Sequence, residues 1–388
     1  MRVLVSTGIF PNRSDMTRGV YVFAQVRALA DRAAVRVVAP VPFIPRLLAS
    51  RRYRPFAQVP HRDTIDGVDV CYPRYVVIPK IFRFLHGLFV YACTLPAHLR
   101  VARAHAPDVV LSFFAYPYGV AAVMVARTLG LPAVVSCRGS DINHLARPFL
   151  HRRIIAASLK RCHAVIAVSR ALADEIARLG VDPARIHVVP NGIDAARFGV
   201  ADRAAARRGL GVDSNGRRLV CVSRLSREKG IDVLVDAMAQ VEDRSVCLTV
   251  VGDGPEYAAL LAQRDRLGLA KRVDFVGRRD HDEIPRWMAA ADAVVLSSRT
   301  EGHPNVLVEA LASGRPVVAT RVGGVPEIVA GPELGIVVPP EDAAALARGI
   351  SDVLARAWDT EVLVRAARAR TWHDVADDLH RILAGGVT

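Results

Sequence analysis

Short apolar runs alternate with amphipathic segments along almost the whole chain of 388 residues. Runs of four or five residues rich in Val and Ile predict buried strands, whereas apolar residues spaced three or four apart predict helices. The strands expected in the two halves are residues 3–6, 35–39, 109–113, 133–137, 165–169 and 186–190, then 219–223, 247–251, 273–276, 293–297, 316–320 and 336–339. Several helices are expected between them, at residues 20–30, 118–129, 171–179, 201–211 and 231–241.

This alternation predicts an α/β protein with two doubly wound, Rossmann-like parallel sheets. We expect one domain over residues 1–194 and a second over 195–370, with residues 371–388 forming a terminal helix. Ligands of such sheets bind beyond the carboxyl ends of the strands. The pattern therefore predicts binding sites in a cleft between two facing domains.

The composition fits a packed globular protein, because 52% of residues are hydrophobic and only 23% are charged. The six Cys residues are scattered and form no CxxC pair, so buried free thiols in a reducing compartment are expected. No secretory signal is predicted, because the first residues form a short strand that turns at Gly8.

The net charge of +14 is unevenly distributed. Residues 1–194 contain 26 Lys and Arg against 11 Asp and Glu, whereas residues 195–388 contain 26 against 27. Basic clusters (Arg46, Arg51, Arg52 and Arg54; Arg147, Arg152, Arg153, Lys160 and Arg161) flank the apolar stretch 81–95, which is too short to span a bilayer. This pattern predicts contact with an anionic membrane surface or acceptor. Nucleic acid is not expected as a partner, because no recognition motif for it occurs.

The most informative segment is Glu301-Gly-His-Pro-Asn-Val-Leu-Val-Glu309, which follows a predicted strand and opens a predicted helix. Gly302 and Pro304 predict a tight turn, with Pro304 in the first helical turn. Backbone N–H groups of a helix start attract anions. The segment therefore suits a diphosphate held between two carboxylates that bind hydroxyl groups.

This spacing resembles the Glu-x7-Glu motif of the retaining glycosyltransferases of family 4, which have the GT-B fold. Four further segments are similar to the same family: residues 220–230, which contain Arg224 and Lys229, and residues 252–255, 276–277 and 323–327. Residues 190–194 also match, at the end of the first half. The form Arg138-Gly-Ser-Asp141 resembles members from exopolysaccharide and teichuronic-acid pathways.

The resemblance implies roles for particular residues in a second, nucleotide-sugar-binding domain. Arg224 and Lys229 would neutralise the departing diphosphate, and Glu301 would hold hydroxyls of the donor sugar. Glu309 would accept hydrogen bonds from the ribose. Backbone groups near the sugar, phosphate or base would come from a further set: Gly277, Arg278, His303, Pro304, Asn305 and Val306.

In the first, acceptor-binding domain, Gly19 would let the backbone approach the phosphates. Arg138 and Asp141 follow a strand and are expected at the donor site. Many family members have His in place of Arg138, so Arg138 could bind an anionic group. A structural Arg that is salt-bridged to Asp141 is the alternative. The terminal helix is expected to cross back onto this domain.

No metal and no cofactor are expected, since GT-B enzymes use cationic side chains and helix N-termini instead. Asp280-His281-Asp282 has the DxD pattern of a metal site, but it precedes a predicted helix start. An Asp at the N-cap and in the first turn is ordinary helix chemistry.

The resemblance thus implies a retaining glycosyltransferase that uses a UDP- or GDP-sugar, and we expect a lipid-linked saccharide as its acceptor. We expect it in the bacterial cytoplasm, peripheral on the inner face of the plasma membrane. The alternatives are a GT-B enzyme with a soluble small or polymeric acceptor, a nucleotide-sugar epimerase and a non-enzymatic nucleotide-sugar sensor. The sequence leaves the donor sugar, base, acceptor, linkage and oligomeric state open.

Overall fold

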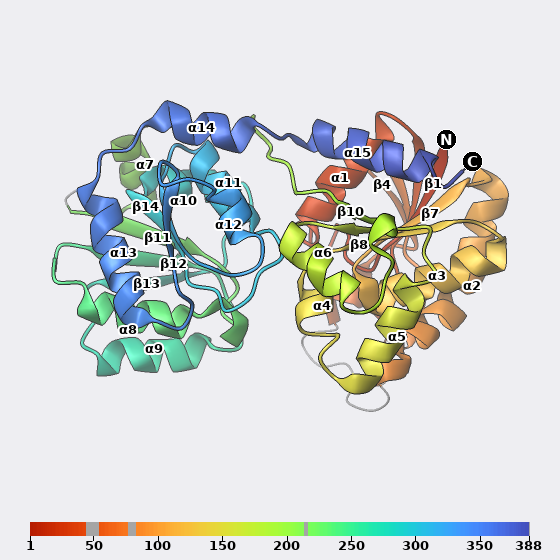
Figure 1. Cartoon of the computed structure of the whole chain (residues 1–388), viewed down its shortest axis with the longest axis horizontal. Helices are drawn as coiled ribbons and strands as arrows, with labels where there is room; N and C mark the ends of the chain where they lie inside the picture. Colours follow the sequence, from red (N-terminus) through yellow and green to blue (C-terminus); the bar gives the residue numbers. More distant parts are fainter. Residues whose placement is uncertain (44–53, 77–82, 213–215, 388) are drawn as a thin grey trace. The chain divides into compact units, whose positions relative to one another are not determined.

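The computed structural model divides the chain into two compact units (Figure 1). It describes residues 1–43, 54–76, 83–212 and 216–387. The first unit comprises Met1–Gly192 and Trp372–Thr388, and the second comprises Ile193–Thr371. The sequence predicted boundaries after residues 194 and 370. The first lies two residues after the observed division, and the second lies one residue before it. Two α/β units with parallel sheets confirm the expected fold class.

The first unit is built on an eight-stranded sheet with the order β10-β9-β8-β7-β1-β2-β5-β4. Neighbouring strands are parallel except for the antiparallel pair β4–β5. Strands that follow β1 are added on one side of it, beginning with β2, and strands that follow β7 are added on the other side, beginning with β8. The strand order therefore reverses between β1 and β7. The bounds are β1 (Arg2–Ser6), β2 (Ala34–Val38), β4 (Arg62–Ile65), β5 (Val68–Cys71), β7 (Val109–Phe113), β8 (Ala133–Cys137), β9 (Ala164–Ala167) and β10 (Ile186–Val188).

Helices cover both faces of this sheet, which places one hydrophobic core on each face. Strands β7 and β8 are buried along their whole length, as expected for strands covered on both sides. Before the chain enters the second unit, the described helices of this unit are α1 (Val20–Ala30), α2 (His86–His105), α3 (Val120–Leu129), α4 (Ser140–Asn143), α5 (Phe149–Leu159) and α6 (Arg170–Ala177), with short turns η1 (Arg54–Gln58), η2 (Arg83–Leu85), η3 (Ala115–Gly119) and η4 (Pro183–Arg185).

Four strands between β2 and α2 were not expected from the apolar pattern. Two of them, β4 and β5, form a hairpin in which Ile65 pairs with Val68. Asp66 and Gly67 form its two-residue turn with φ values of 44° and 80°. Asp-Gly is a strong hairpin signal in a sequence, so the pair was detectable. The other two, β3 (Val41–Phe43) and β6 (Arg74–Val76), are three-residue strands that pair with each other.

The second unit contains a six-stranded parallel sheet with the order β13-β12-β11-β14-β15-β16. Here the order reverses between β11 and β14, which pair directly. Crevices at such reversals, beyond the carboxyl ends of the strands, are the usual ligand sites of doubly wound sheets. The bounds are β11 (Arg218–Val222), β12 (Cys247–Val251), β13 (Val273–Gly277), β14 (Ala293–Leu296), β15 (Val317–Thr320) and β16 (Gly335–Val338).

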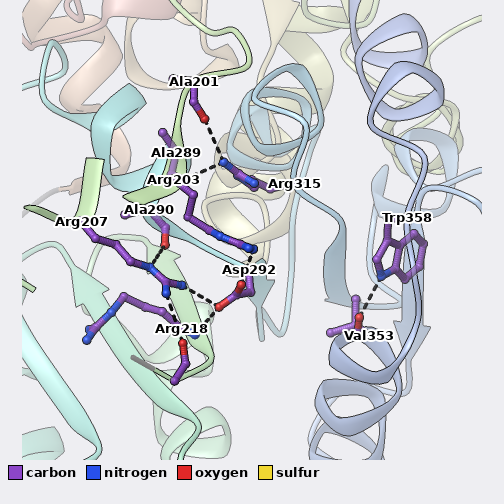
Figure 2. A network of polar contacts seen from close by, with 11 residues as sticks. Ala201, Arg203, Arg207, Arg218, Ala289, Ala290, Asp292, Arg315, Val353 and Trp358 are labelled. Carbon is purple, nitrogen blue, oxygen red and sulfur yellow. Dashed lines mark hydrogen bonds and ion pairs between the residues drawn. The ribbon is translucent and has the colours of Figure 1, made fainter. Parts of the chain in front are cut away.

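Helices also cover both faces of the second sheet, with a core on each face. They are α7 (Arg203–Leu210), α8 (Ile231–Gln240), α9 (Tyr257–Arg266), α10 (Ile284–Ala290), α11 (Asn305–Ala312), α12 (Val325–Ile328), α13 (Ala343–Ala355) and α14 (Thr360–Arg368), with the short turn η5 (Arg227–Lys229). The indole N–H of Trp358 donates a 2.8 Å hydrogen bond to the carbonyl of Val353, which fixes the chain after α13 (Figure 2).

The amino ends of β11 and β14 are joined by a network around Asp292 (Figure 2). This carboxylate accepts hydrogen bonds from Arg203, from Arg207 at 2.7 Å and from the backbone N–H of Arg218 at 2.6 Å. Arg207 also donates to the carbonyl of Ala290 at 2.9 Å and is only 5% exposed. One carboxylate thus attaches α7 to two neighbouring strands of the sheet.

The last helix, α15 (Trp372–Ala384), belongs to the first unit, where it packs beside α1 (Figure 1). Val375, Leu379 and Leu383 bury one face of the helix in the core below. Arg32 forms a two-pronged ion pair with Asp377 at the rim of this contact. Within the described part of the chain, no helix combines the length and the apolar character that crossing a membrane requires.

Candidate functional site

Lys229 and Glu301 meet at the reversal of strand order in the second unit. Lys229 follows β11, and Glu301 follows β14, so both lie beyond carboxyl ends of adjacent strands. The ammonium group of Lys229 donates a 2.7 Å hydrogen bond to Glu301 Oε1, and the hydroxyl of Ser298 donates to the same oxygen at 2.6 Å. The Glu301 side chain is 8% exposed and that of Lys229 is 26% exposed. The pair is partly shielded from water, which strengthens the attraction between the two charges.

Two glycines allow the loops around Glu301 to approach one another. Gly230 has a φ of +61°, and a Cβ there would lie 2.1 Å from the carbonyl oxygen of Ser297. Gly323 has a φ of +50°, and a Cβ there would lie 2.1 Å from the carbonyl oxygen of Glu301. The N–H of Gly324 donates to the carbonyl of Gly302 at 2.9 Å. The glycines of Lys229-Gly230 and Gly323-Gly324 therefore allow the neighbouring loops to pack against the turn that carries Glu301.

Glu309 lies in the second turn of α11 and is 3% exposed. Its Oε1 atom is 4.0 Å from Nε2 of His281, which comes from the loop after β13. Burial lowers the pKa of His281, and the charge of Arg197 lowers it further. A neutral imidazole and a buried carboxylate thus face each other at the edge of the sheet, a pair of groups suited to binding hydroxyls.

His281 was missed as a site residue because it was interpreted as part of a helix start. The expectation of an Asp N-cap there was wrong. The N-cap residue of α10 is Glu283, which makes no side-chain capping bond, and the helix begins at Ile284. The guanidinium of Arg197 instead bonds to Nδ1 of His281 at 2.9 Å and to Asp282. No signal in the sequence connects residue 281 with residue 309, because only the fold brings these segments together.

The other expected donor residues lie in the same loops of the second unit. Arg224 follows β11 and is exposed, and its side chain makes no hydrogen bond or ion pair with any described residue. Gly277 ends β13 with a φ of +77°, and Arg278 after it is exposed. Pro304 is the N-cap of α11 and not part of its first turn. Asn305 and Val306 therefore open the helix, and His303 directly precedes the N-cap.

In the first unit, the loop after β1 begins at Gly8 and ends at Gly19. Gly19 is the N-cap of α1 with a φ of +68°, and a Cβ there would lie 2.5 Å from the carbonyl oxygen of Ile9. A Cβ at Gly8 would lie 1.8 Å from the ring of Tyr118. The loop is therefore tightly folded at the reversal of strand order between β1 and β7.

Asp141 is fully buried and organises the carboxyl end of β8. Its carboxylate accepts hydrogen bonds from the backbone N–H groups of Ala115 at 2.7 Å, Arg138 at 3.0 Å and Gly139 at 2.9 Å. Burial raises the pKa of Asp141, and these hydrogen bonds oppose that shift. The carboxylate joins the ends of β7 and β8.

The Arg138 side chain does not form the alternative ion pair with Asp141. Asp141 binds the backbone of Arg138 and not its guanidinium. The guanidinium donates instead to the amide oxygen of Gln25 at 2.7 and 3.1 Å, once that amide is oriented with its oxygen toward Arg138. Burial lowers the pKa of Arg138 to about 10, so it stays charged at neutral pH. A half-buried cation bound to a neutral amide suits an anionic ligand.

The described residues contain no group of three His, Cys, Asp or Glu side chains that could hold a metal ion. Within Asp280-His281-Asp282, His281 contacts Arg197 and Glu309, and Asp282 contacts Arg197. The Cys residues at 71, 93, 137, 162, 221 and 247 are all free thiols.

Two family models match the chain. Residues 216–356 match the model described as glycosyl transferases group 1, and residues 19–197 match the model of glycosyltransferase family 4. One relative spans nearly the whole chain. It is the putative teichuronic acid biosynthesis glycosyltransferase TuaC of Bacillus subtilis, 30% identical over 98% of this chain and 93% of its own length.

Another relative, the N-acetyl-alpha-D-glucosaminyl L-malate synthase of Bacillus anthracis, is 28% identical over 64% of this chain and 65% of its own length. Among solved structures, sucrose-phosphate synthase of Thermosynechococcus elongatus superposes with a TM-score of 0.79 at 22% identity, covering 99% of this chain and 98% of its own. HepE of Anabaena, in complex with UDP, has a TM-score of 0.74 at 24% identity and covers 99% and 100%. These two structures share the fold.

Proposed function

Because the chain belongs to glycosyltransferase family 4 and has the GT-B fold, we propose that it is a retaining, metal-independent enzyme that uses a UDP- or GDP-sugar. The observation that carries this proposal is the Lys229–Glu301 pair at the reversal of strand order, with Glu309 on the following helix. Lys229 would neutralise the leaving diphosphate, Glu301 would hold the donor sugar, and Glu309 would bind the ribose. The complexes of HepE with UDP and UDP-glucose support a nucleotide-sugar donor.

For the acceptor we propose a lipid-linked saccharide at the inner membrane surface, in the synthesis of a bacterial surface polysaccharide. The name of the TuaC relative supports a polysaccharide pathway. A surface at the start of α5 supports the membrane: Phe149 is 71% exposed and Leu150 is 43% exposed, with the guanidinium of Arg153 5.1 Å from the Phe149 ring centroid. Apolar and basic side chains together suit an anionic membrane surface. The basic residues at 46, 51 and 52 lie outside the described residues.

A soluble acceptor is the second candidate, and the names of two relatives favour it. Besides the malate synthase, a D-inositol 3-phosphate glycosyltransferase of Mycolicibacterium vanbaalenii is 37% identical over 48% of this chain. Both names specify small acceptors. The two candidates share a donor site and differ in the acceptor alone, so the donor and acceptor need separate tests.

The donor test is the thermal shift produced by UDP-, GDP-, ADP- and TDP-sugars without added metal, on the wild type, Glu309→Ala and the exposed control Glu242→Ala. Stabilisation by one nucleotide class that is lost only in Glu309→Ala is the expected result. An equal shift in all three proteins would contradict the assigned donor site.

The acceptor test is cosedimentation with phosphatidylglycerol vesicles at low and high salt. We expect binding that high salt abolishes and that a Phe149→Ser, Leu150→Ser variant weakens. Absence of vesicle binding, together with transfer to a soluble saccharide, would favour the second candidate.

A further inference from the structure

A second cluster of cationic side chains lies at the opposite end of the first sheet from Arg138. A pocket of about 550 Å³ opens at the amino ends of β8, β9 and β10. Ala133 opens β8 and Arg138 follows its carboxyl end, so the two ends are about 16 Å apart at 3.3 Å per residue. The pocket is therefore separate from the carboxyl edge, where the expected site residues of this unit lie.

The charged lining of this pocket is entirely cationic or basic. Three arginines and two histidines contribute, and the lining contains no Asp or Glu: Arg127, Arg161, Arg185, His163 and His187. They come from the end of α3, the turn before β9, the turn η4 and strand β10. Burial lowers the pKa of His187, and the charge of His163 lowers it further.

None of these five side chains is paired with a carboxylate of the described residues. Arg161, which follows α5, donates to the carbonyl of Ala157 in that helix, and Arg185 has only a long 3.5 Å contact with the carbonyl of Cys162. Another pocket of this unit, with a volume of about 700 Å³ beside β5, differs in this respect. There Arg13 is paired with Asp63, and Arg36 is paired with Asp69.

Stabilisation of a helix end by a cation explains the position of only one of the five residues. Arg127 lies in the last turn of α3, where a cation complements the helix dipole. The other four come from three further elements, so no single helix end explains their convergence. Guanidinium groups bind phosphate oxygens two at a time, and imidazoles add further donors. The volume is in the range of small-molecule sites and exceeds the needs of a single phosphate.

We propose that this pocket binds a phosphate-bearing anion with at least two phosphoryl groups, independently of the donor site. The anion would be either a soluble diphosphate compound or the headgroup of a phospholipid. Binding there would leave Lys229 and Arg138 available to the reaction, so the ligand would be an effector or an anchor and not a substrate.

The first experiment is calorimetric titration of the full chain with inorganic pyrophosphate. It compares the wild type, an Arg127→Gln, Arg185→Gln double variant, and an Arg103→Gln, Arg208→Gln control that removes two exposed arginines elsewhere. We expect the double variant to bind at least tenfold more weakly than the control, because two charge-assisted contacts are lost. The same binding event must persist in Lys229→Ala. Equal affinity in the double variant and the control, or loss of the event in Lys229→Ala, would overturn the proposal.

A second measurement needs no variant. Modification of histidines by diethyl pyrocarbonate, followed by mass spectrometry, should show protection of His163 and His187 by pyrophosphate, with the exposed His61 of the same unit unprotected. Cardiolipin vesicles, whose headgroups carry two phosphoryl groups, are used in place of pyrophosphate to identify the source. Protection by the vesicles alone supports a lipid headgroup, and protection by pyrophosphate supports a soluble ligand. Absence of selective protection by both probes would overturn the proposal.

Discussion

The Lys229 ammonium donates a 2.7 Å hydrogen bond to Glu301, a residue 72 positions further along the chain. The contact joins the loops that follow β11 and β14, which are neighbours in the sheet although two other strands separate them in sequence. Glu301 also accepts from Ser298, so its Oε1 atom has two donors. A diphosphate at this edge would find Lys229 already positioned by a carboxylate, which is the preorganisation that electrostatic catalysis requires.

Removal of the Lys229 charge should affect catalysis far more than stability. We expect Lys229→Met to reduce turnover about 10²-fold or more, because charge on the leaving diphosphate is no longer neutralised. Lys271→Met is the matched control, since Lys271 is an exposed lysine of the same unit. Steady-state kinetics with a saturating donor measures the effect. Wild-type turnover in Lys229→Met would remove Lys229 from the site.

The same pair can be tested for energetic coupling. Unfolding of Lys229→Met, Glu301→Gln and the double variant forms a thermodynamic cycle. Residues in direct contact couple by about 0.5–3 kcal/mol. We expect a coupling in this range, because Glu301 is largely shielded from water. Additive effects of the two substitutions would show that the contact has no energetic consequence.

The sequence predicts those residues of the site that lie in one continuous segment after a strand. The Glu301–Glu309 segment, Lys229-Gly230 and the strands before them carry strong local patterns, and the structure places these strands within about one residue of expectation. The contact of His281 with Glu309 and that of Arg138 with Gln25 have no local signature. Both contacts depend on the order of the strands in the sheet, which decides which loops lie side by side. The pattern of apolar and polar residues along the sequence does not specify that order. The Asp66-Gly67 hairpin is different, because its signal was present in the sequence.

Asp292 should be important for the stability of the second unit. Asp292→Asn keeps the shape of the side chain but removes the charge that compensates Arg203 and the buried Arg207 (Figure 2). Breaking a buried pair by removing one partner costs about 3–5 kcal/mol. Urea unfolding followed by tryptophan fluorescence measures this cost, because Trp287 and Trp358 lie in the second unit. Asp352→Asn, at an exposed position, should change the free energy of unfolding by less than about 0.5 kcal/mol. Similar costs for the two variants would disprove the role of the network.

Substitutions of Arg138 and Asp141 should have different effects: one on the binding of substrate and the other on the stability of the protein. Asp141→Asn presents an amide in place of a carboxylate to three backbone donors, so we expect a cost of about 3 kcal/mol in unfolding free energy. Arg138→Gln should leave stability within about 1 kcal/mol and raise KM for donor or acceptor about tenfold. Paired unfolding and kinetic measurements distinguish the two effects. A loss of stability in Arg138→Gln as large as in Asp141→Asn would mean that Arg138 is structural.

The stability of the first unit should fall in mild acid because of His98. This side chain is fully buried: Nδ1–H donates to the carbonyl of Thr94 at 2.9 Å, and Nε2 accepts from the hydroxyl of Ser6 at 3.0 Å. The imidazole is therefore held neutral, and burial lowers its pKa from 6.5 to about 4.

The direction of the pH effect follows from proton binding. Between pH 6.5 and about 4 the unfolded chain binds a proton at His98 that the folded chain does not, so stability rises with pH in this window. The contribution is complete above pH 6.5 and is lost as the pH falls toward 4. The difference between the two pKa values corresponds to about 3 kcal/mol.

The variant His98→Asn retains a donor for the Thr94 carbonyl and removes the titrating group. Its free energy of unfolding should be lower than that of the wild type at pH 7 but should depend less on pH between 4 and 6.5. Carboxylates also titrate near pH 4, so the informative quantity is the difference between the two proteins at each pH. His61→Asn, at an exposed position, should keep the wild-type slope. If His98→Asn and the wild type lost stability in parallel over this range, the acid sensitivity would have to come from other groups.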